Sequence, residues 1–364
     1  MKAPADLGYR WPAEWEPHRA TWLSWPHNRE TWPESLPAVS ESFAAMVRAL
    51  VPHEAVCIGV GDEAIESRAR AALARAGVDP EGVTFHRYAT NDAWARDHGP
   101  IFVVRREPQA PEGRTQRAAG DQGPSGRARL AVLDFRFDNW GRKYPGWEAD
   151  DSVPGHVAHI LSLPRFACET VLEGGAIDGD GLGSVLTTES CLQNPNRGPG
   201  RTRERMEQVL ADSLGATRVL WLAGGIEGDD TDGHVDDVAR FVAPGVVVAA
   251  VCADRADANW VPLAENRRRL GAMTDARGAA LSVVELPMPP RLSAGALRSP
   301  ASYANFYLAN GVALVPTFGV PSDARALAIL RELLAGREIV GIPSAELVSG
   351  LGAVHCVTQQ EPAV

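Results

Sequence analysis

The chain has 364 residues, 45% of them hydrophobic and 23% charged, so it has the composition of a globular protein with room for two domains or one large closed architecture. Its formal net charge of −10 argues against a nucleic-acid partner and is compatible with a cationic small-molecule substrate. The first residues lack the apolar core of a signal peptide, and the longest apolar run, near 241–252, is too short to cross a bilayer. The five cysteines form no C-x-x-C pair and fit reduced thiols, so we expect a cytoplasmic protein with no membrane partner.

Apolar runs rich in β-branched residues alternate with helical patterns along the chain, which predicts an α/β fold. The expected strands are 55–60, 101–104, 130–135, 218–222, 246–251, 312–316 and 354–358. The expected helices are 40–50, 201–214 and 324–335, the last with Ser322 or Asp323 as N-cap and Gly336 as its stop signal.

The segment 105–129 is rich in proline, glycine and charge, and it predicts a flexible surface loop between two strands. No other segment has the composition of a linker, so we expect one continuous domain over residues 1–364.

Strand-like segments repeatedly run into stretches rich in glycine and acidic residues. Five such places occur, namely the segment that ends at Asp97, then 169–175, 219–234, 310–319 and the C-terminal segment. No repeat is visible letter by letter. Five similar modules would nevertheless account for the length and would bring five strand ends to one centre.

The run D-D-T-D-G-H-V-D-D at 229–237 contains His234 and Asp236 two residues apart. On a strand this spacing places both side chains on one face, and the apolar V-A-R-F-V-A that follows favours such a strand. We therefore expect His234 and Asp236 to belong to a site. The alternative interpretation is an acidic, solvated loop.

Two further stretches carry candidate site residues. In N-D-A-W-A-R-D-H-G-P, at 91–100, Asp97 precedes a Gly-Pro turn and Trp94 is placed to form the wall of a pocket. A structural pair between Arg96 and Asp97 is the alternative. In V-L-E-G-G, at 171–175, Glu173 precedes two glycines that permit a close backbone approach, whereas the alternative is a tight hairpin with an exposed glutamate.

Cys356 lies eight residues from the end of the sequence, in a segment expected to be a strand. A thiol is a nucleophile only as its thiolate, so it needs a base or a positive neighbour. Adjacent strand residues face opposite sides, so His355 is a poor candidate and His234, oriented by Glu173, is a better one. The other four cysteines, at 57, 168, 191 and 252, have apolar neighbours and are expected to be inert core residues.

Carboxylates, a histidine and a thiol in one site suit a guanidinium group, whose planar fork of donors pairs with carboxylates. Each charge-assisted hydrogen bond contributes roughly 1.5–3 kcal/mol and holds the central carbon in place. That carbon is a poor electrophile, and a thiolate pressed against it would make displacement of ammonia feasible.

Seven motifs, taken together and in order, resemble the agmatine deiminase family of the guanidine-modifying, or pentein, superfamily. The motifs are W-P-A-E-W-E-P-H (11–18), W-P-H-N (25–28), N-D-A-W-A-R-D-H-G-P (91–100), L-E-G-G-A-I-D-G-D-G (172–181), D-T-D-G-H-V-D-D-V-A-R-F (230–241), S-Y-A-N-F-Y-L-A-N-G (302–311) and H-C-V-T-Q-Q-E-P (355–362). The resemblance implies a five-bladed, pseudo-symmetric α/β propeller. It also implies hydrolysis of agmatine to N-carbamoylputrescine and ammonia through a covalent thiouronium, with no cofactor and no metal.

Carried over position by position, the resemblance assigns the nucleophile to Cys356 and the general acid/base to His234. Asp97 and Asp236 would bind the guanidinium, Glu173 would support His234 and the guanidinium, and Trp94 would line the pocket. Members of this family are commonly homo-oligomers.

The sequence departs from the family pattern at two places. G-L-G-A at 350–353 replaces a longer glycine run, and W-G-R at 140–142 replaces W-G-G. Leu351, Ala353 and Arg142 are therefore expected to reshape the part of the pocket that receives the far amine of the substrate. If Arg142 pointed inward it would repel the ammonium of agmatine and favour a guanidine that bears a carboxylate.

Other functions remain open on the sequence alone. D-G-H-V-D at 232–236 has the D-x-H-x-D spacing of binuclear manganese sites, which would suit a metal-dependent ureohydrolase but would leave Cys356 unused. A deiminase that acts on arginine, on peptidyl-arginine or on a guanidino acid would share the core chemistry. A protein that binds guanidines or polyamines without turnover is the non-enzymatic alternative.

Overall fold

The computed structural model describes residues 2–105, 129–294 and 297–364. The flexible loop predicted at 105–129 lies outside the described residues except for its two ends. These ends meet, because the backbone N–H of Arg105 donates to the carbonyl of Arg129 at 2.8 Å.

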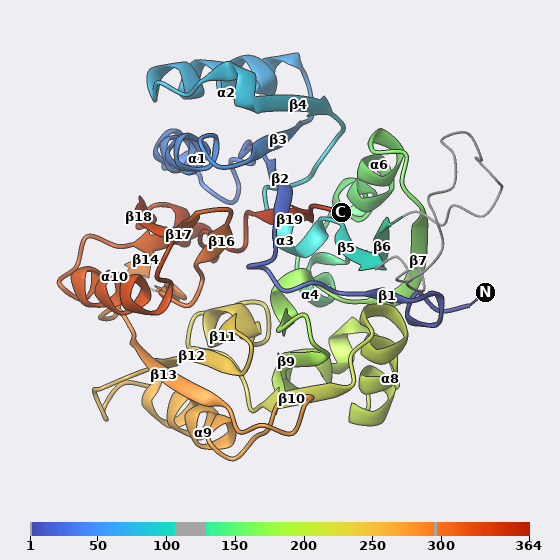
Figure 1. The fold of residues 1–364 in the computed structure, drawn as a ribbon. Coiled ribbons are helices and arrows are strands. Elements are labelled where there is room, and N and C mark those ends of the chain that lie inside the picture. Colours follow the sequence, from blue (N-terminus) through green and yellow to red (C-terminus); the bar gives the residue numbers. More distant parts are fainter. Residues whose placement is uncertain (1, 106–128, 295–296) are drawn as a thin grey trace.

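Five sheets surround a common centre, with the helices at the periphery (Figure 1). Each of these sheets contains the same triplet, in which the first strand is antiparallel to the second and the second is parallel to the third. A parallel connection needs a crossover, and helices supply it in each sheet. The five-bladed α/β propeller is therefore confirmed, although no letter-by-letter repeat encodes it.

The bounds of the elements follow blade by blade. The first blade contains β19 (Gln359–Pro362), β2 (His18–Ser24), α1 (Leu36–Leu50), β3 (Ala55–Val60), α2 (Glu63–Arg75) and β4 (Val83–Arg87). The second contains β1 (Tyr9–Arg10), β5 (Ile101–Arg105), β6 (Leu130–Arg136), α4 (Asn139–Arg142), α5 (Glu148–Asp151), α6 (Val153–Ile160) and β7 (Arg165–Val171), preceded by α3 (Ala95–His98). The third contains β8 (Asp178–Gly179), β9 (Ser184–Thr188), α7 (Glu189–Leu192), α8 (Arg203–Leu214) and β10 (Arg218–Leu222).

The fourth blade contains β11 (Ala239–Ala243), β12 (Val246–Val251), α9 (Trp260–Leu270) and β13 (Ser282–Pro287). The fifth contains β16 (Tyr307–Ala309), β17 (Val312–Thr317), α10 (Ser322–Leu333) and β18 (Glu338–Pro343), and a small hairpin, β14 (Ser293–Ala294) with β15 (Leu297–Arg298), lies between these two blades in sequence. Short turns join three of the antiparallel pairs, β8 with β9, β11 with β12 and β16 with β17. Asn310 and Gly311 connect β16 to β17, and the φ of +68° at Gly311 suits glycine in such a turn.

The predicted strands agree with the structure except for 354–358. Residues of that segment form consecutive turns, and β19 begins only at Gln359. Its backbone groups bond to other loops instead of to a ladder. The carbonyl of Cys356 accepts from the backbone N–H of Arg96 at 3.0 Å, and the N–H of His355 donates to the carbonyl of Asn305 at 3.1 Å. The prediction was wrong because it read an apolar run as a strand where tertiary contacts impose a turn.

The predicted helices are present with shifted ends. Helix α1 begins at Leu36 because Pro37 suits the first turn of a helix. Helix α10 begins at Ser322, and neither Ser322 nor Asp323 caps it. The Asp323 carboxylate instead accepts the backbone N–H groups of the preceding turn, residues 318–320, at 2.8–3.2 Å.

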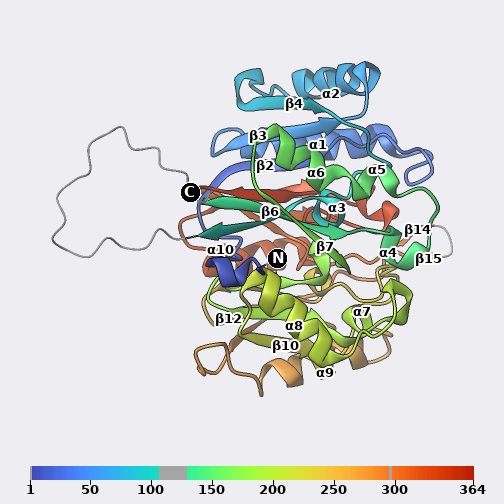
Figure 2. The same cartoon turned by 90° about the vertical axis from the view of Figure 1, so that its right-hand side faces the viewer.

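The C-terminal strand closes the ring. Strand β19 pairs antiparallel with β2, so the end of the sequence completes the blade that the N-terminal part begins. In the side view it runs between the blue strands of the first blade and the green strands of the second (Figure 2). Of the helices in the described residues, none is long and apolar enough to cross a membrane.

Candidate functional site

One or two polar side chains precede the first strand of each blade, and these side chains form the candidate site. Asp97 lies before β5, Glu173 before β8, His234 and Asp236 before β11, Asn305 before β16, and Cys356 before β19. All six are buried, with at most 7% of each residue exposed. Three of the expected modules therefore contribute as predicted, and so does the C-terminal segment. The module at 310–319 was wrong, because it covers β17 and the side chain of the fifth blade comes from the loop before β16.

Asp97 sits in the short helix α3, where both of its carboxylate oxygens are engaged. Oδ1 accepts from the backbone N–H of Gly175 at 3.0 Å, and Oδ2 accepts from the indole N–H of Trp140 at 3.0 Å. Burial raises the pKa of Asp97; the charge of His234 lowers it in part, and Asp236 raises it further. The alternative of an Arg96–Asp97 pair is not supported, since Arg96 pairs with Glu14 at 3.2 Å.

Glu173 is fully buried, so the exposed hairpin glutamate considered above is excluded. Arg197 holds it, because the Arg197 Nε lies 2.7 and 3.0 Å from the two Glu173 oxygens. The same guanidinium also binds Asp232 at 2.7 Å and the carbonyl of Thr231 at 2.6 Å. Burial opposes ionisation of Glu173, but Arg197 and then His234 outweigh it and lower the pKa of the carboxyl group.

Asp236 lies in a 3-10 turn, η5 (Val235–Asp237), and His234 lies immediately before it, whereas the strand that was predicted to contain them begins only at Ala239. The predicted alternative of a solvated loop is also wrong for these two residues, because they are 1% and 0% exposed. Neither ring nitrogen of His234 has a hydrogen-bond partner among the described residues, and Nδ1 lies 3.7 Å from Asp97 Oδ1. Burial lowers the pKa of His234, but Asp97 and contacts with Cys191 and Glu173 raise it well above its ordinary value.

Gly175 marks the point where three functional groups converge. A Cβ atom at this position would lie 2.6 Å from His234 Nδ1, 2.8 Å from Asp97 Oδ1 and 3.1 Å from Asp236 Oδ2. The close backbone approach predicted for the two glycines after Glu173 is therefore confirmed. It brings side chains from the second and fourth blades against the backbone of the third.

The Cys356 sulfur lies in the same cluster, 3.8 Å from Asp236 Oδ2 and 3.1 Å from the side-chain nitrogen of Asn305. Burial, followed by the charges of Asp236, Asp237 and Asp97, raises the pKa of the thiol well above its ordinary value. Burial also opposes ionisation of Asp236, but a hydrogen bond from His355 and electrostatic interactions with His355, His234 and Arg240 together outweigh it and lower the pKa of that carboxyl group.

The ring of His355 bonds to partners other than the thiol, although not for the reason expected. Both residues lie in a turn, so the alternation of side chains along a strand does not apply to them. The ring of His355 instead bridges two carboxylates. Its Nδ1 lies 2.7 Å from Asp236 Oδ2, and its Nε2 lies 2.8 Å from Glu14 Oε2. Glu14 also contacts Arg240 at 2.9 Å. His355 and Glu14 thus fix the orientation of Asp236.

The other four cysteines were expected to be inert core residues, but only two of them are buried. Cys57 and Cys191 are buried, whereas Cys168 and Cys252 are partly exposed. Cys191 is not in purely apolar surroundings, because its sulfur, a ring nitrogen of His234 and a Glu173 oxygen lie within 4.8 Å of one another. In the described part of the chain this is the one group with the spacing of a metal site. Both Glu173 oxygens, however, already bind Arg197.

The D-x-H-x-D motif does not converge on a common point. The Asp232 carboxylate binds Lys143 at 2.8 Å, Asn196 at 2.8 Å and Arg197 at 2.7 Å. It therefore faces a cluster of donors, while Asp236 lies beside the Cys356 thiol and His234 lies beside Asp97. The contacts give no support to a binuclear metal site built on this motif.

Aromatic side chains border the cluster. The ring of Trp94 packs against Trp32 and against Gly352, where a Cβ atom would come within 2.4 Å of the indole. Gly350, where a Cβ atom would come within 2.5 Å of the Trp32 indole, is equally restricted, and these two glycines flank Leu351 beside the buried Ala353. Trp140, which sequence reasoning missed, reaches Asp97 from a segment with left-handed backbone.

Arg142 does not enter the site. Its side chain is 74% exposed, lies 3.7 Å from Asp138 and stacks over the ring of Trp147. The predicted repulsion of a substrate amine therefore does not arise from this residue.

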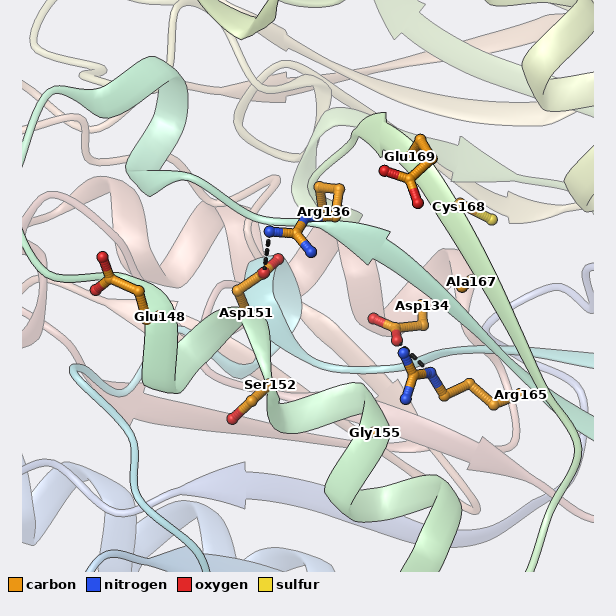
Figure 3. A pocket seen from close by; sticks show the side chains of 10 residues that line it. All are labelled: Asp134, Arg136, Glu148, Asp151, Ser152, Gly155, Arg165, Ala167, Cys168 and Glu169. Carbon is orange, nitrogen blue, oxygen red and sulfur yellow. Dashed lines mark ion pairs between the residues drawn. The ribbon is translucent and has the colours of Figure 1, made fainter.

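A separate surface pocket of about 280 Å³ lies over β6, β7, α5 and α6, and shares no residue with the cluster (Figure 3). Its two arginines are already paired, Arg136 with Asp151 at 2.8 Å and Arg165 with Asp134 at 2.5 Å. The pocket has the character of a charged surface groove rather than of a reaction site.

Four contributing residues escaped prediction: Glu14, Trp140, Arg197 and Asn305. Glu14, Trp140 and Asn305 lie in the motifs at 11–18, 140–142 and 302–311. Arg197 ends the run N-P-N-R at 194–197, which no expectation covered. Their partners lie far away in sequence, so spacing along the chain carried no signal for them.

Comparisons with known proteins identify the family of the chain. The family model described as Porphyromonas-type peptidyl-arginine deiminase matches residues 10–362. The agmatine deiminase of Stutzerimonas stutzeri (strain A1501) is 35% identical over 383 residues, which covers 99% of this chain and 97% of that protein. The agmatine deiminase of Pseudomonas aeruginosa (strain LESB58) is 34% identical with the same coverage.

Solved structures lead to the same family. The agmatine deiminase of Enterococcus faecalis aligns with a TM-score of 0.88 at 31% identity, over 100% of this chain and 98% of that one. A substituted agmatine deiminase of C. jejuni, with substrate bound, aligns with a TM-score of 0.82 at 27% identity, over 97% and 96% of the two chains. With the five-bladed fold and these full-length similarities, the chain belongs to the agmatine deiminase family of the pentein superfamily.

Proposed function

We propose that this protein hydrolyses the guanidinium group of agmatine to give N-carbamoylputrescine and ammonia, with Cys356 as nucleophile and without a cofactor. The observation that carries the proposal is the position of the Cys356 sulfur, 3.8 Å from Asp236 Oδ2 in a buried cluster of carboxylates. Such a cluster favours a flat cation and holds the carbon of that cation against the sulfur.

Binding would rest on Asp97 and Asp236, which accept N–H groups of the guanidinium. The negative charge of Glu173 is balanced by Arg197, and the Glu173 carboxylate would stabilise protonated His234. Trp94 and the backbone at Gly352 form the wall beside the sulfur.

The charges make formation of the thiolate at neutral pH depend on the substrate. In the free protein, burial and the surrounding carboxylates raise the pKa of Cys356, so the sulfur keeps its proton. A guanidinium that enters the cluster cancels part of this negative charge, so the thiol releases its proton to solvent and the thiolate forms next to its target carbon.

The reaction then proceeds in two displacements. The sulfur attacks the guanidinium carbon, the C–N bond breaks, and ammonia leaves with a proton from protonated His234, whose raised pKa suits a general acid. A water molecule next gives a proton to the neutral His234 ring and attacks the thiouronium carbon. The C–S bond breaks, and the remaining hydroxyl proton of the adduct passes to the departing sulfur, which releases the neutral ureido product and returns Cys356 as a thiol.

Product analysis tests the function. Purified protein is incubated with agmatine, arginine, an arginine-containing peptide and guanidino acids, with and without a chelator, and ammonia, urea and ureido product are measured. We expect equal amounts of ammonia and N-carbamoylputrescine from agmatine, unaffected by the chelator. Urea that disappears with chelation would establish a ureohydrolase instead, and binding without product would establish a binding protein.

Cys356→Ser provides the matching variant, with Cys252→Ser at the end of β12 as its control. Cys356→Ser should abolish turnover and retain binding of agmatine, while Cys252→Ser should keep wild-type rates, because that thiol is remote from the cluster. Calorimetric titration with agmatine separates binding from turnover. Normal turnover by Cys356→Ser would contradict the assignment of the nucleophile.

The proposal extends to the setting of the reaction. The expected product is a carbamoylated diamine, which suits a role in putrescine biosynthesis in the cytoplasm. We also propose a homo-oligomer, and light scattering of the purified chain tests the mass in solution.

A further inference from the structure

Asn305 occupies the one blade position of the cluster that the proposed mechanism leaves without a role. In the other four blades the polar residue before the first strand is a proposed reacting or binding group, namely Asp97, Glu173, the pair His234 and Asp236, or Cys356. Asn305 stands at the same place, two residues before β16, and it is fully buried. The pseudo-symmetry of the fold thus points its amide at the same centre.

The surrounding contacts fix the orientation of this amide. Its Oδ1 accepts from the backbone N–H of His355 at 2.9 Å and from that of Cys356 at 3.3 Å. Backbone N–H groups are donors only, so the atom that faces them must be the oxygen. Nδ2 then faces the Cys356 sulfur at 3.1 Å and Asp237 Oδ1 at 3.0 Å.

The sulfur needs such a donor because its other side-chain neighbours oppose its charge. Asp236 lies 3.8 Å away, and Asp97 and Asp237 add further negative charge. The thiol proton can be donated to Asp236 Oδ2 or, at 3.5 Å, to Asn305 Oδ1. Once that proton is lost, both oxygens repel the anion.

Two donors remain for the anion in the described part of the chain. A backbone hydrogen bond at Ala353 lowers the pKa of the thiol in part. The N–H of Asn305 is the one side-chain donor on the sulfur among the described residues, and its hydrogen bond becomes stronger as the thiolate forms.

We propose that Asn305 is a further catalytic residue, whose side-chain N–H stabilises the thiolate of Cys356 during its formation and during its departure from the thiouronium. The proposal rests on the function proposed above for Cys356. Asp237, which accepts the second N–H of the amide, keeps the donor turned toward the sulfur. No proton is transferred by Asn305, so the balance of the reaction is unchanged.

The test measures the thiolate directly in Asn305→Asp. This variant keeps an oxygen for the two backbone N–H groups and replaces the fixed donor by an acceptor. The rate of Cys356 alkylation by iodoacetamide is followed against pH, without substrate, by mass spectrometry of the peptide that contains Cys356. We expect the alkylation profile to move upward by about one pH unit or more, with about tenfold slower alkylation at a fixed pH below the thiol pKa.

Asn305→Ala keeps the test decisive if the first variant folds poorly. A looser turn would expose the sulfur and speed its alkylation, whereas loss of the donor slows it, so the sign of the change separates the two effects. Asn266→Asp in α9 is the matched control, because Asn266 is equally buried and likewise accepts a backbone N–H, that of Ala223 at 2.8 Å. It should leave the profile of Cys356 unchanged.

An unchanged or downward-shifted profile in both Asn305 variants would overturn the proposal. Under agmatine turnover we further expect kcat to fall about 100-fold in Asn305→Asp, with KM changed by less than about threefold. Should the wild-type chain release no ammonia from any guanidine, the proposed function fails, yet the alkylation profile still decides whether Asn305 stabilises the thiolate.

Discussion

At the scale of single residues, burial and neighbouring charges determine the protonation states of the two proposed reacting groups, Cys356 and His234. The pKa of the buried Cys356 thiol is raised and that of His234 is raised as well, so the resting pair is a thiol and an imidazolium. Neither is the reactive form for attack. The thiolate is expected to form when the positive charge of a substrate enters the cluster, so the cluster favours cationic substrates.

Asp236→Asn tests this electrostatic argument through two readouts that move in opposite directions. Asp236 is ionised and lies 3.8 Å from the sulfur, so its charge raises the pKa of the thiol. Its removal should lower that pKa, and the pH profile of Cys356 alkylation should move to lower pH by about one unit. Turnover of agmatine should nevertheless be lost, because the guanidinium loses a partner. Alkylation that shifts to higher pH would contradict the argument.

Gly175→Ala tests the convergence of the blades. The added methyl group would lie 2.6 Å from His234 Nδ1 and 2.8 Å from Asp97 Oδ1, so these side chains must separate. We expect a loss of kcat of at least about 100-fold, since small displacements of reacting groups are costly. The matched control is Gly271→Ala at the end of α9, where the nearest atom is 3.6 Å away and activity should be unchanged. Equal activity of both variants would show that the cluster tolerates expansion.

At the scale of elements, patterning in the sequence predicts the strands that form ladders and fails where loops bond to loops. The runs 55–60, 218–222 and 246–251 match β3, β10 and β12 because their alternating or continuous apolar residues reflect burial in a sheet. The turn around Cys356 has a similar apolar composition but bonds to Asn305 and Arg96, which no local pattern encodes. The turn around His234 is acidic, and the backbone N–H of His234 donates to Asp229 instead of to a neighbouring strand. The candidate site residues of these turns were predicted from their chemistry and from the family resemblance, whereas the turn conformation of their backbone was not predicted.

The α4 segment offers a test of backbone strain that leaves the site intact. Arg142 has a left-handed φ of +61°, and its side chain is 74% exposed, so replacement removes little packing. Arg142→Gly should stabilise the protein by about 1 kcal/mol, because glycine adopts this conformation without a steric cost. Arg142→Ala, which keeps the Cβ atom, should give no such gain, and denaturant unfolding measures both. Turnover of agmatine should be unchanged in each variant. A tenfold change would show that Arg142 contributes to substrate binding or catalysis.

At the scale of the whole molecule, the site exists because the ring is closed. The proposed nucleophile, Cys356, belongs to the last blade position, and β19 ties that position to β2 at the other end of the sequence. Glu361 strengthens the junction, since its carboxylate accepts from the indole N–H of Trp22 at 2.8 Å and pairs with Arg19. The five sheets are local in sequence except at this junction and at the pairing of β1 with β5, and no pattern within a single segment predicts the closure.

Removal of residues 359–364 should therefore cost far more than the loss of one short strand. Without β19, the edge of β2 is exposed, Arg96 loses its contact with Gln360, and the turn that carries Cys356 loses its anchor on one side. We expect a chain that is largely insoluble, or one that melts at a much lower temperature and has no turnover. Removal of Val364 alone is the control, because this residue is 51% exposed and should leave the melting temperature unchanged. A truncated chain that melts and turns over agmatine like the full chain would show that the cluster is held by its five loops without the closing strand.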